Sequence, residues 1–249
     1  MPYKEHERLK TPADKNIIWR YMDFTKFVAM LDGSSLYFSS ATKLREQDPG
    51  EASFCHFISK KLKQHMAKNN QLKNNIVKPL LHDLNATLVY VNCWHLSDCE
   101  SAALWKLYSK GDDVITIKSS VGKLKKAISK CPENVNICKV IYDPQKSGYM
   151  KSENINRKSY DLDDAITCKR PSFKHEKELR LFVTKFNLDN NSKVDNYGLK
   201  VKTNLNALIS KVVVSPQAPL WICDLIERIS QHYDYSFDIS KSTLNETPF

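Results

Sequence analysis

The sequence predicts a single-domain α+β fold, and three observations support that class. Short runs with strand-like alternation are mixed with segments of helical spacing, without the regular alternation of βαβ folds. Hydrophobic residues make up 41% of the 249 residues, which is enough for a sizeable core. No internal repeat, heptad array or low-complexity linker divides the chain. We expect a polar arm over residues 1–15 and one domain over residues 16–249, with a mixed or antiparallel sheet flanked by helices.

Strand-like and helical segments follow one another through the first half of the chain. A helix that begins at Phe24 is expected to end at Asp32-Gly33, because glycine readily adopts the left-handed backbone of a helix end. Asp48-Pro49-Gly50 is typical of a turn, and Asn69-Asn70 marks a break in a lysine-rich helical region. The elements expected here are strands at residues 17–23, 35–40, 86–97 and 113–119, and helices at residues 24–31, 51–84, 100–111 and 121–130.

The second half of the chain continues the mixture. Residues 144–163 are polar and typical of a loop, and the run LWICDLIERISQHY is an amphipathic helix by its spacing. The elements expected here are strands at residues 136–143, 165–171, 178–186, 210–216 and 234–242, and a helix at residues 220–233.

The chain carries a net charge of +10 and has a pI of about 9.1. This surplus favours a polyanionic partner such as nucleic acid, although a merely basic surface accounts for it almost as well. The polar loop offers Lys151, Arg157 and Lys158 as nucleic-acid contacts, with a plain surface loop as the equal alternative. Only six glycines are present, and no glycine-rich phosphate loop is found.

The seven cysteines are odd in number and irregular in spacing, which indicates free thiols in a reducing cytoplasm. The N-terminus lacks the apolar core of a signal peptide, and no apolar run is long enough to span a membrane. We therefore expect a cytoplasmic protein.

Three residues resemble a metal-ligand set, namely Cys93, His95 and Cys99. Residues 93 and 95 share one face of an apolar strand, however. We therefore expect these side chains to pack in the core and expect no metal site.

The segment FKHEKELR places Glu176 and Glu178 one residue apart at the start of an apolar run. If both lie on a strand, their side chains point to the same face, and burial of two like charges raises one pKa. The surrounding Lys174, Lys177 and Arg180 allow the alternative of a charged strand end with salt bridges, which the residues alone favour. A metal-dependent nuclease could also use carboxylates and a lysine in this arrangement.

Four stretches of the chain form a series of motifs with a definite order and spacing. Their characteristic positions are Arg20-Tyr21, residues 36–40, Asp48-Pro49, Trp105, Tyr108, Gly111, Glu176, Glu178 and Arg180. This series resembles the bacterial family called domain of unknown function 2971. The resemblance extends from about residue 17 to residue 240 and includes the C-terminal strand, proline turn and helix. Gln47 stands where that family usually has asparagine.

A weaker resemblance links the chain to the ADP-ribosyltransferase superfamily and implies an ADP-ribosyltransferase-like fold. Members place Arg or His on a first strand, Ser or Tyr on the next, and Glu, often in E-x-E, on a late strand. The resemblance implies that Glu178 stabilises an oxocarbenium-like state and that Glu176 orients or deprotonates the acceptor. The spacing of the middle motif leaves Ser97 as an alternative. The resemblance implies cofactor-binding roles for Arg20, Tyr21, Tyr37, Ser39 and Ser40.

The leading hypothesis is an intracellular NAD-dependent ADP-ribosyltransferase or NAD glycohydrolase, a phage-defence effector or toxin that acts on nucleic acid. NAD would be its substrate. The alternative is a non-catalytic nucleic-acid or protein-binding module of a defence system, in which the Arg–Glu network is purely structural. A nuclease is the third candidate. The sequence does not indicate an oligomeric state.

Overall fold

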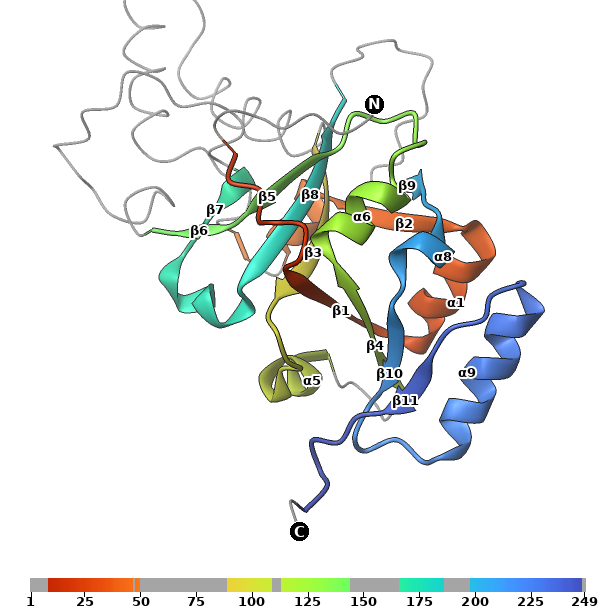
Figure 1. Ribbon diagram of the computed structural model, residues 1–249. Helices are drawn as coiled ribbons and strands as arrows, with labels where there is room; N and C mark the ends of the chain where they lie inside the picture. The colour runs from red at the N-terminus through yellow and green to blue at the C-terminus, as the bar shows by residue number, and fades with distance from the viewer. Residues whose placement is uncertain are drawn as a thin grey trace, which may run out of the picture.

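The structure, a computed structural model, describes residues 9–46, 48–49, 89–108, 113–143, 166–185 and 198–247. These residues form a nine-stranded sheet with the strand order β11-β10-β4-β1-β3-β2-β9, and β8 joins β3 to β5 beside that path (Figure 1). Every pairing in this sheet is antiparallel except that of β10 with β11. The predicted α+β class with a central, mainly antiparallel sheet is therefore confirmed.

The strands are short, and most match an expected apolar run. A separate pair, β6 (Ile141–Tyr142) and β7 (Cys168–Lys169), is parallel. The strands of the large sheet are β1 (Ile17–Asp23), β2 (Ser35–Ser40), β3 (Val89–Leu96), β4 (Val114–Ser120), β5 (Asn136–Lys139), β8 (Glu178–Thr184), β9 (Gly198–Lys202), β10 (Lys211–Val214) and β11 (Ile239–Lys241).

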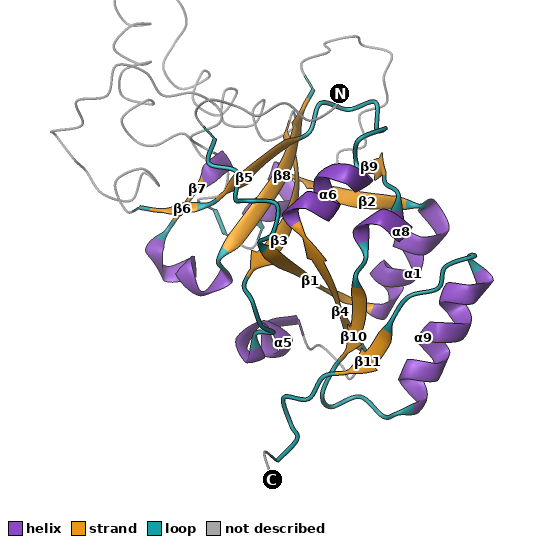
Figure 2. Ribbon diagram, viewed as in Figure 1, coloured by secondary structure: helices purple, strands orange, loops and turns teal. Residues whose placement is uncertain are grey.

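Polar side chains at strand ends start several helices. Asp23 accepts a hydrogen bond from the Lys26 N–H at the start of α1 (Phe24–Gly33), which ends at Ser34 with a left-handed φ of 42°. At the start of α6, the Ser120 hydroxyl accepts a hydrogen bond from the Lys123 N–H in the same way. The other helices are α2 (Ala41–Arg45), α5 (Ala102–Tyr108), α6 (Val121–Ala127), α8 (Leu205–Leu208), α9 (Trp221–His232) and the 3₁₀ helix η1 (Pro171–Glu176) (Figure 2).

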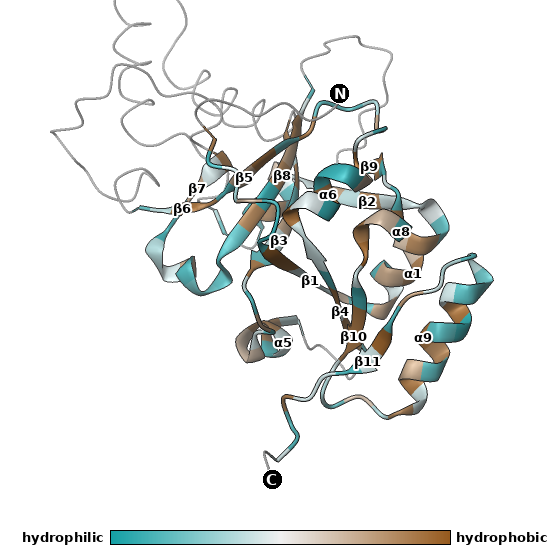
Figure 3. Ribbon diagram, in the orientation of Figure 1, coloured by the Kyte–Doolittle hydropathy of each residue, from teal (hydrophilic) through white to brown (hydrophobic). Residues whose placement is uncertain are grey.

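The two faces of the sheet differ in what covers them. Helices α1, α6, α8 and α9 pack on the core face, whose strands contribute Ile18, Phe38, Trp94 and Leu181 to the main hydrophobic cluster. The opposite face, which we call the polar face, carries Cys93, His95, Glu178 and Arg180, because opposite residues of antiparallel strands share a face. Figure 3 shows apolar colouring along the central strands and hydrophilic colouring along η1 and much of α6.

Two smaller clusters complete the polar face. Helix α5 packs Leu104 and Trp105 against Trp19 and Tyr21 of β1. Helix α2 lies over the other end, where Ala41 contacts the cluster that includes Val89, Val91 and Phe182. The charged residues of the polar face lie between these two apolar patches, so they are held by packing on both sides.

The structure also corrects several expected elements. The strand expected at residues 136–143 is interrupted at Val140, the one at 165–171 is reduced to Cys168–Lys169, and the final strand begins only at Ile239. Strand β9 and helix α8 were not expected, because GLKVK and LNAL are short and partly polar. The helices expected at residues 51–84 and the loop expected at residues 144–163 lie outside the described residues.

The described end of the N-terminal arm contacts the domain. The Lys139 N–H donates to the Lys10 carbonyl over 3.0 Å, and the Thr11 hydroxyl donates to the Ile137 carbonyl over 2.7 Å. The domain boundary at residue 16 stays a prediction. Within the described segments, no helix combines the length and the apolar character needed to cross a membrane.

Candidate active site

The acid pair is built by a tight turn rather than by strand alternation. Glu176 ends η1, Lys177 has a left-handed backbone with φ of 41°, and β8 starts at Glu178. The expectation that both glutamates lie on one strand is therefore wrong. The left-handed residue reverses the chain instead and brings the two side chains together at the Lys169 ammonium group.

Buried cations hold both carboxylates. The Lys169 ammonium lies 2.5 Å from Glu176 Oε2 and 3.5 Å from Glu178 Oε1. Arg180 donates from Nε to Glu178 Oε2 over 2.7 Å, and its Nη1 donates to the Ile166 carbonyl over 2.7 Å. Exposed fractions of the side chains are 15% for Glu176, 11% for Glu178, 8% for Lys169 and 1% for Arg180. Glu178 thus pairs with Arg180, but inside the protein and not on an exposed surface.

The two carboxyl groups are pushed in opposite directions. Burial, the charge of Glu178 and a hydrogen bond to it raise the pKa of Glu176, which Lys169 opposes. Burial acts to raise the pKa of Glu178 as well, but the charges of Arg180 and Lys169 and their contacts outweigh it and lower that pKa below its ordinary value. Environments that separate the pKa values of neighbouring acids in this way are typical of acid–base sites, where one group stays ionised and the other exchanges a proton.

Other polar groups fix the backbone around the pair. The Tyr142 hydroxyl accepts from the Glu178 N–H over 2.8 Å. His95, opposite Glu178 on β3, lies with Nδ1 2.7 Å from the Glu176 carbonyl. Burial lowers the pKa of His95, so its ring is neutral at neutral pH and its Nδ1–H donates to that carbonyl. Neither residue was singled out for this role from the sequence, because both contacts join distant segments.

The turn after β2 also reaches this region. Asp48, in the predicted Asp48-Pro49 motif, is buried and forms an ion pair with Arg170, the residue that precedes η1. Arg170 and Lys169 both lie over the Phe173 ring, at 5.0 and 4.5 Å from its centroid. A motif near the start of the chain therefore anchors the segment that carries the acid pair.

Arg20 lies where the sheet forks. Strand β3 pairs with β1 through His95 and Leu96 and with β2 through Tyr90 and Val91. Between these pairings, Arg20 donates to the Cys93 carbonyl over 3.0 Å and to the Tyr37 carbonyl over 3.5 Å. These contacts use only part of a guanidinium group that has five N–H donors. Burial lowers the pKa of Arg20, which the Tyr108 and Cys93 groups oppose, and arginine stays protonated at neutral pH.

Tyr108 connects Arg20 with the acid pair. Desolvation raises the pKa of the Tyr108 phenol to about 12; the Cys93 thiol and the two glutamates add to the increase, whereas Arg20 opposes it. Tyr108 is thus within electrostatic range of both Arg20 and Glu178, although no direct contact joins those two among the described residues.

Tyr21 belongs to the aromatic cluster around Tyr108. Its ring lies 6.1 Å from that of Tyr108, nearly parallel, and meets Trp105 edge-on at 5.1 Å. Its hydroxyl accepts from the Ser101 N–H over 2.8 Å, and burial raises its pKa to about 12. The Tyr21 hydroxyl is therefore occupied inside the protein, and its ring supports Tyr108.

The three candidates on β2 separate into two groups. Tyr37 and Ser39 point to the polar face, since Ser39 lies opposite Val91. Ser40 is buried, and its hydroxyl accepts from the Lys43 N–H as the N-cap of α2. The alternative Ser97 lies at the end of β3, where its hydroxyl accepts from the Cys99 N–H over 3.4 Å.

Some expectations lie outside what the structure describes. Lys151, Arg157 and Lys158 fall in residues 144–165, which are not described, and so does Gly111 in residues 109–112. Among the described residues, no group of three or more His, Cys, Asp or Glu side chains could hold a metal ion.

Comparison with known families supports part of the predicted resemblance. A family model described as "Protein of unknown function (DUF2971)" matches residues 104–181. That range contains Trp105, Tyr108, Glu176, Glu178 and Arg180, so the resemblance is confirmed over this segment. The predicted match of residues 17–50 lies outside it. A comparison with curated protein sequences finds no match.

Solved structures of a Thermus protein are among the structural matches. Thermus sp. 2.9 DarT in complex with NAD⁺ has 12% sequence identity and a TM-score of 0.42, and the match covers 94% of this chain and 98% of that chain. The complex of the same protein with ADP-ribosylated ssDNA has 13% identity and a TM-score of 0.41, with 94% and 97% covered.

Proposed function

We propose that the chain is an NAD-dependent ADP-ribosyltransferase or NAD glycohydrolase whose acceptor is nucleic acid. The observation that supports it most is the buried pair of carboxyl groups that share the Lys169 ammonium, one of them bound by Arg180 as well. The choice of NAD as the substrate rests on the sequence resemblance. A cytoplasmic location and a role in phage defence or as a toxin belong to the same proposal and rest on the sequence alone.

Cleavage of the bond between nicotinamide and ribose places developing positive charge on the sugar. The nicotinamide leaves with the bonding electron pair, and an ionised carboxylate beside the sugar stabilises the oxocarbenium-like state. Glu178 suits this task because Arg180 and Lys169 keep it ionised. The fixed position of its carboxylate means that little reorganisation is needed when the charge appears.

Glu176 suits the proton transfer. The incoming hydroxyl or amino group of the acceptor, or a water molecule, must lose a proton as it bonds to the sugar. A carboxylate with a raised pKa accepts a proton more readily than an ordinary one, since general bases work best with a pKa near the operating pH. Lys169, in contact with both acids, then balances the charge that remains.

Arg20 suits the binding of the substrate's phosphates. Its two contacts with carbonyl oxygens fix the guanidinium in the fork of the sheet, and its remaining N–H groups suit an anion. Tyr108, whose side chain is exposed, offers a ring for a planar group of the substrate. The role of Arg20 is the one that the resemblance implies, whereas that of Tyr108 rests on its exposed ring alone.

The second candidate is a non-catalytic binding module, and a specific observation favours it. Both carboxylate oxygens of Glu178 already form ion pairs, Oε2 with Arg180 and Oε1 with Lys169, and the side chain is 11% exposed. In such a module the network would only stabilise the turn between η1 and β8. The two candidates differ in one measurable property, the release of nicotinamide.

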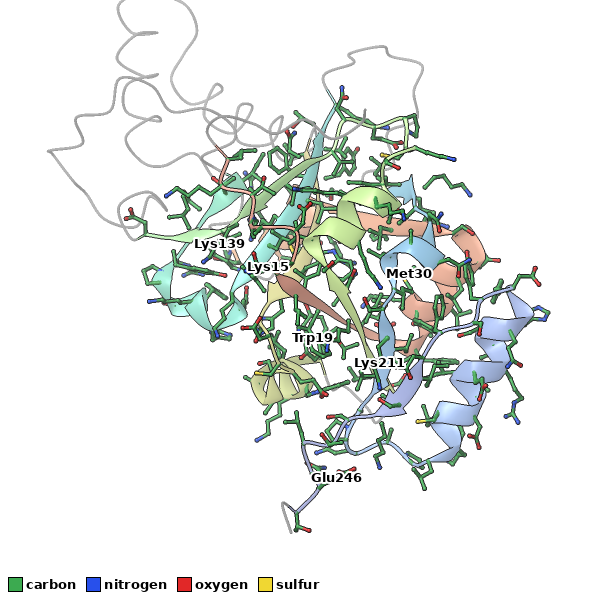
Figure 4. The ribbon with its side chains drawn as sticks, viewed as in Figure 1. Lys15, Trp19, Met30, Lys139, Lys211 and Glu246 are labelled. Atoms are coloured by element: carbon green, nitrogen blue, oxygen red, sulfur yellow. The ribbon has the colours of Figure 1, made fainter. Side chains whose placement is uncertain are left out.

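The test is nicotinamide release from NAD, with and without single-stranded DNA or RNA, by the wild type and by Glu178→Gln and Glu176→Gln. Glu246→Gln is the matched control, because Glu246 is exposed near the C-terminal end of the chain, beyond β11 (Figure 4). We expect release by the wild type and the control, and a loss of at least about 100-fold in Glu178→Gln. Circular dichroism checks that each variant is folded. Absence of release by the wild type under all conditions would reject the enzyme in favour of the binding module.

A further inference from the structure

The polar face continues beyond the acid pair onto the edge of the sheet. Strand β9 pairs antiparallel with β2, and Lys200 lies directly opposite Tyr37, while Lys202 lies opposite Ser35. Leu199 and Val201 alternate with these lysines and pack against the main core on the core face. Tyr37, Lys200 and Lys202 therefore share the polar face, and we call them the edge patch.

The side chains of the edge patch are exposed. Tyr37 keeps 42% of its surface accessible, a large value for an aromatic residue on a strand, and both lysines are exposed. The Lys202 ammonium donates to the Gly33 carbonyl over 3.0 Å, and no acidic partner of it is found in the described part of the chain. No acidic partner of Lys200 is found among the described residues. The patch thus combines an aromatic ring with two positive charges.

A glycine makes room for the Tyr37 side chain. A Cβ atom built at Gly198 would lie 2.2 Å from Tyr37 Cζ and 2.3 Å from its hydroxyl oxygen, so the phenol end of the ring lies directly over the β9 backbone. Any larger residue at position 198 would displace the ring. The position of the ring on the edge patch therefore depends on this glycine.

The edge patch lies close to the candidate active site. Strand β2, which carries Tyr37, is separated from β8, which carries Glu178, only by β3. Two strand spacings amount to about 10 Å. The Tyr37 carbonyl also accepts hydrogen bonds from Arg20 and Asn92. A chain molecule bound at the patch therefore has to cross only β3 to reach the acid pair.

We propose that the edge patch binds single-stranded nucleic acid and leads the acceptor nucleotide to the acid pair. An exposed ring accepts a stacked base without regard to its identity, and lysines beside it neutralise phosphates. An unpaired base is required for stacking, which favours a single strand over a duplex. The net charge of +10 agrees with a polyanionic ligand. The delivery step rests on the proposed function, whereas binding itself does not.

The binding test uses a fluorescein-labelled single-stranded oligonucleotide of about 16 nucleotides, made as DNA and as RNA, in anisotropy titrations over a range of salt concentrations. Lys200→Gln/Lys202→Gln is compared with Lys123→Gln/Lys126→Gln. The second pair removes the same charge from the exposed side of α6, which packs on the core face. Tyr37→Ala, Tyr37→Phe and Gly198→Ala examine the ring.

The expected results are specific to the patch. Lys200→Gln/Lys202→Gln should reduce the slope of log affinity against log salt by about 1.4, since each phosphate contact on a single strand contributes about 0.7. The α6 pair should change it by less than half of that. Tyr37→Ala and Gly198→Ala should weaken binding by about 5-fold or more, while Tyr37→Phe, which keeps the ring, should bind like the wild type.

Four results would overturn the proposal. The first is that the wild type does not bind the oligonucleotide, and the second is that neither Tyr37→Ala nor Lys200→Gln/Lys202→Gln changes its affinity. The third is that a duplex of the same sequence binds equally well. The fourth is that an acidic peptide displaces the oligonucleotide at equal charge concentration, which would favour a peptide site. Patch-dependent binding without nicotinamide release would reject the proposed function but leave the patch as a nucleic-acid site.

Discussion

The two faces of the central sheet have almost opposite chemistry. On the core face, strand residues such as Phe38, Ile117 and Leu181 are fully buried among apolar side chains from four helices. On the polar face, β3 and β8 bury His95, Glu178 and Arg180, and the adjoining β7 and η1 add Lys169 and Glu176. Burial of charges costs free energy unless they are paired. The difference indicates that the core face supplies the stability of the domain. It also indicates that the polar face keeps buried charged side chains, which lower stability, because they serve a function.

The largest effect is expected on the core face. Phe38→Ala removes a side chain with no exposed surface and should lower the free energy of unfolding by about 3–5 kcal/mol. Urea denaturation followed by circular dichroism measures it. A loss below about 1 kcal/mol would mean that the core face does not carry the stability of the domain.

Breaking the buried ion pair on the polar face should cost a similar amount for a different reason. Arg180→Met leaves the Glu178 carboxylate without its main partner and should lower the free energy of unfolding by about 3–5 kcal/mol. The double variant Glu178→Gln/Arg180→Met removes both charges and should recover most of that loss. Additive losses in the double-mutant cycle would contradict the pairing.

The acid pair should give opposite pH dependences. Because the pKa of Glu176 is raised in the folded protein, the folded state binds its proton more tightly and stability falls as pH rises above the ordinary glutamate pKa of about 4.3. Glu178, whose pKa is lowered, contributes stability above its ordinary pKa that is lost as pH falls through the lower folded value.

Glu176→Gln separates the two contributions. Relative to the wild type, its free energy of unfolding should increase as pH rises above the ordinary glutamate pKa of about 4.3, because the group that resists ionisation is gone. For Glu178→Gln the difference from the wild type should shrink as pH falls below about 4.3, because the wild type then loses the contribution of the ionised carboxylate. Parallel urea titrations at several pH values measure both, and a pH-independent difference for Glu176→Gln would contradict the raised pKa.

The smallest effect concerns Ser40, where the two faces meet at the end of β2. Its hydroxyl caps α2, so Ser40→Ala should cost about 1 kcal/mol of stability and Ser40→Gly only a few tenths. Thermal unfolding of the two variants compares them. A larger loss in the glycine variant would show that the cap is not the reason for serine at this position.

The sequence predicted the parts that depend on local pattern. The apolar alternation of β1, β2, β3 and β4 and the amphipathic spacing of α9 are local, and each element lies where it was expected. The position of Glu176 could not be predicted in this way. It depends on a left-handed Lys177, and a positive φ at a residue other than glycine leaves no clear mark in the sequence.

The contacts that complete the candidate site are non-local. Lys169 was an unremarked residue of an expected strand, yet its ammonium lies between both glutamates. The fork that holds Arg20 exists only because β3 changes partners from β1 to β2, which no single stretch encodes. The sequence predicted Tyr37 of the edge patch as a cofactor-binding residue, whereas Lys200 and Lys202 were missed together with β9. Order and spacing of motifs predicted Glu176 and Glu178 as candidates, and only the fold shows that Lys169 and Arg180 bind them.

The central claim is that Glu178 is catalytic and not merely the partner of Arg180. The most direct measurement is nicotinamide release from NAD by the double variant Glu178→Gln/Arg180→Met, in which the ion pair is replaced by neutral groups and stability is largely recovered. We predict a folded protein whose release rate is at least about 100-fold below that of the wild type. A folded double variant that releases nicotinamide at the wild-type rate would contradict the claim.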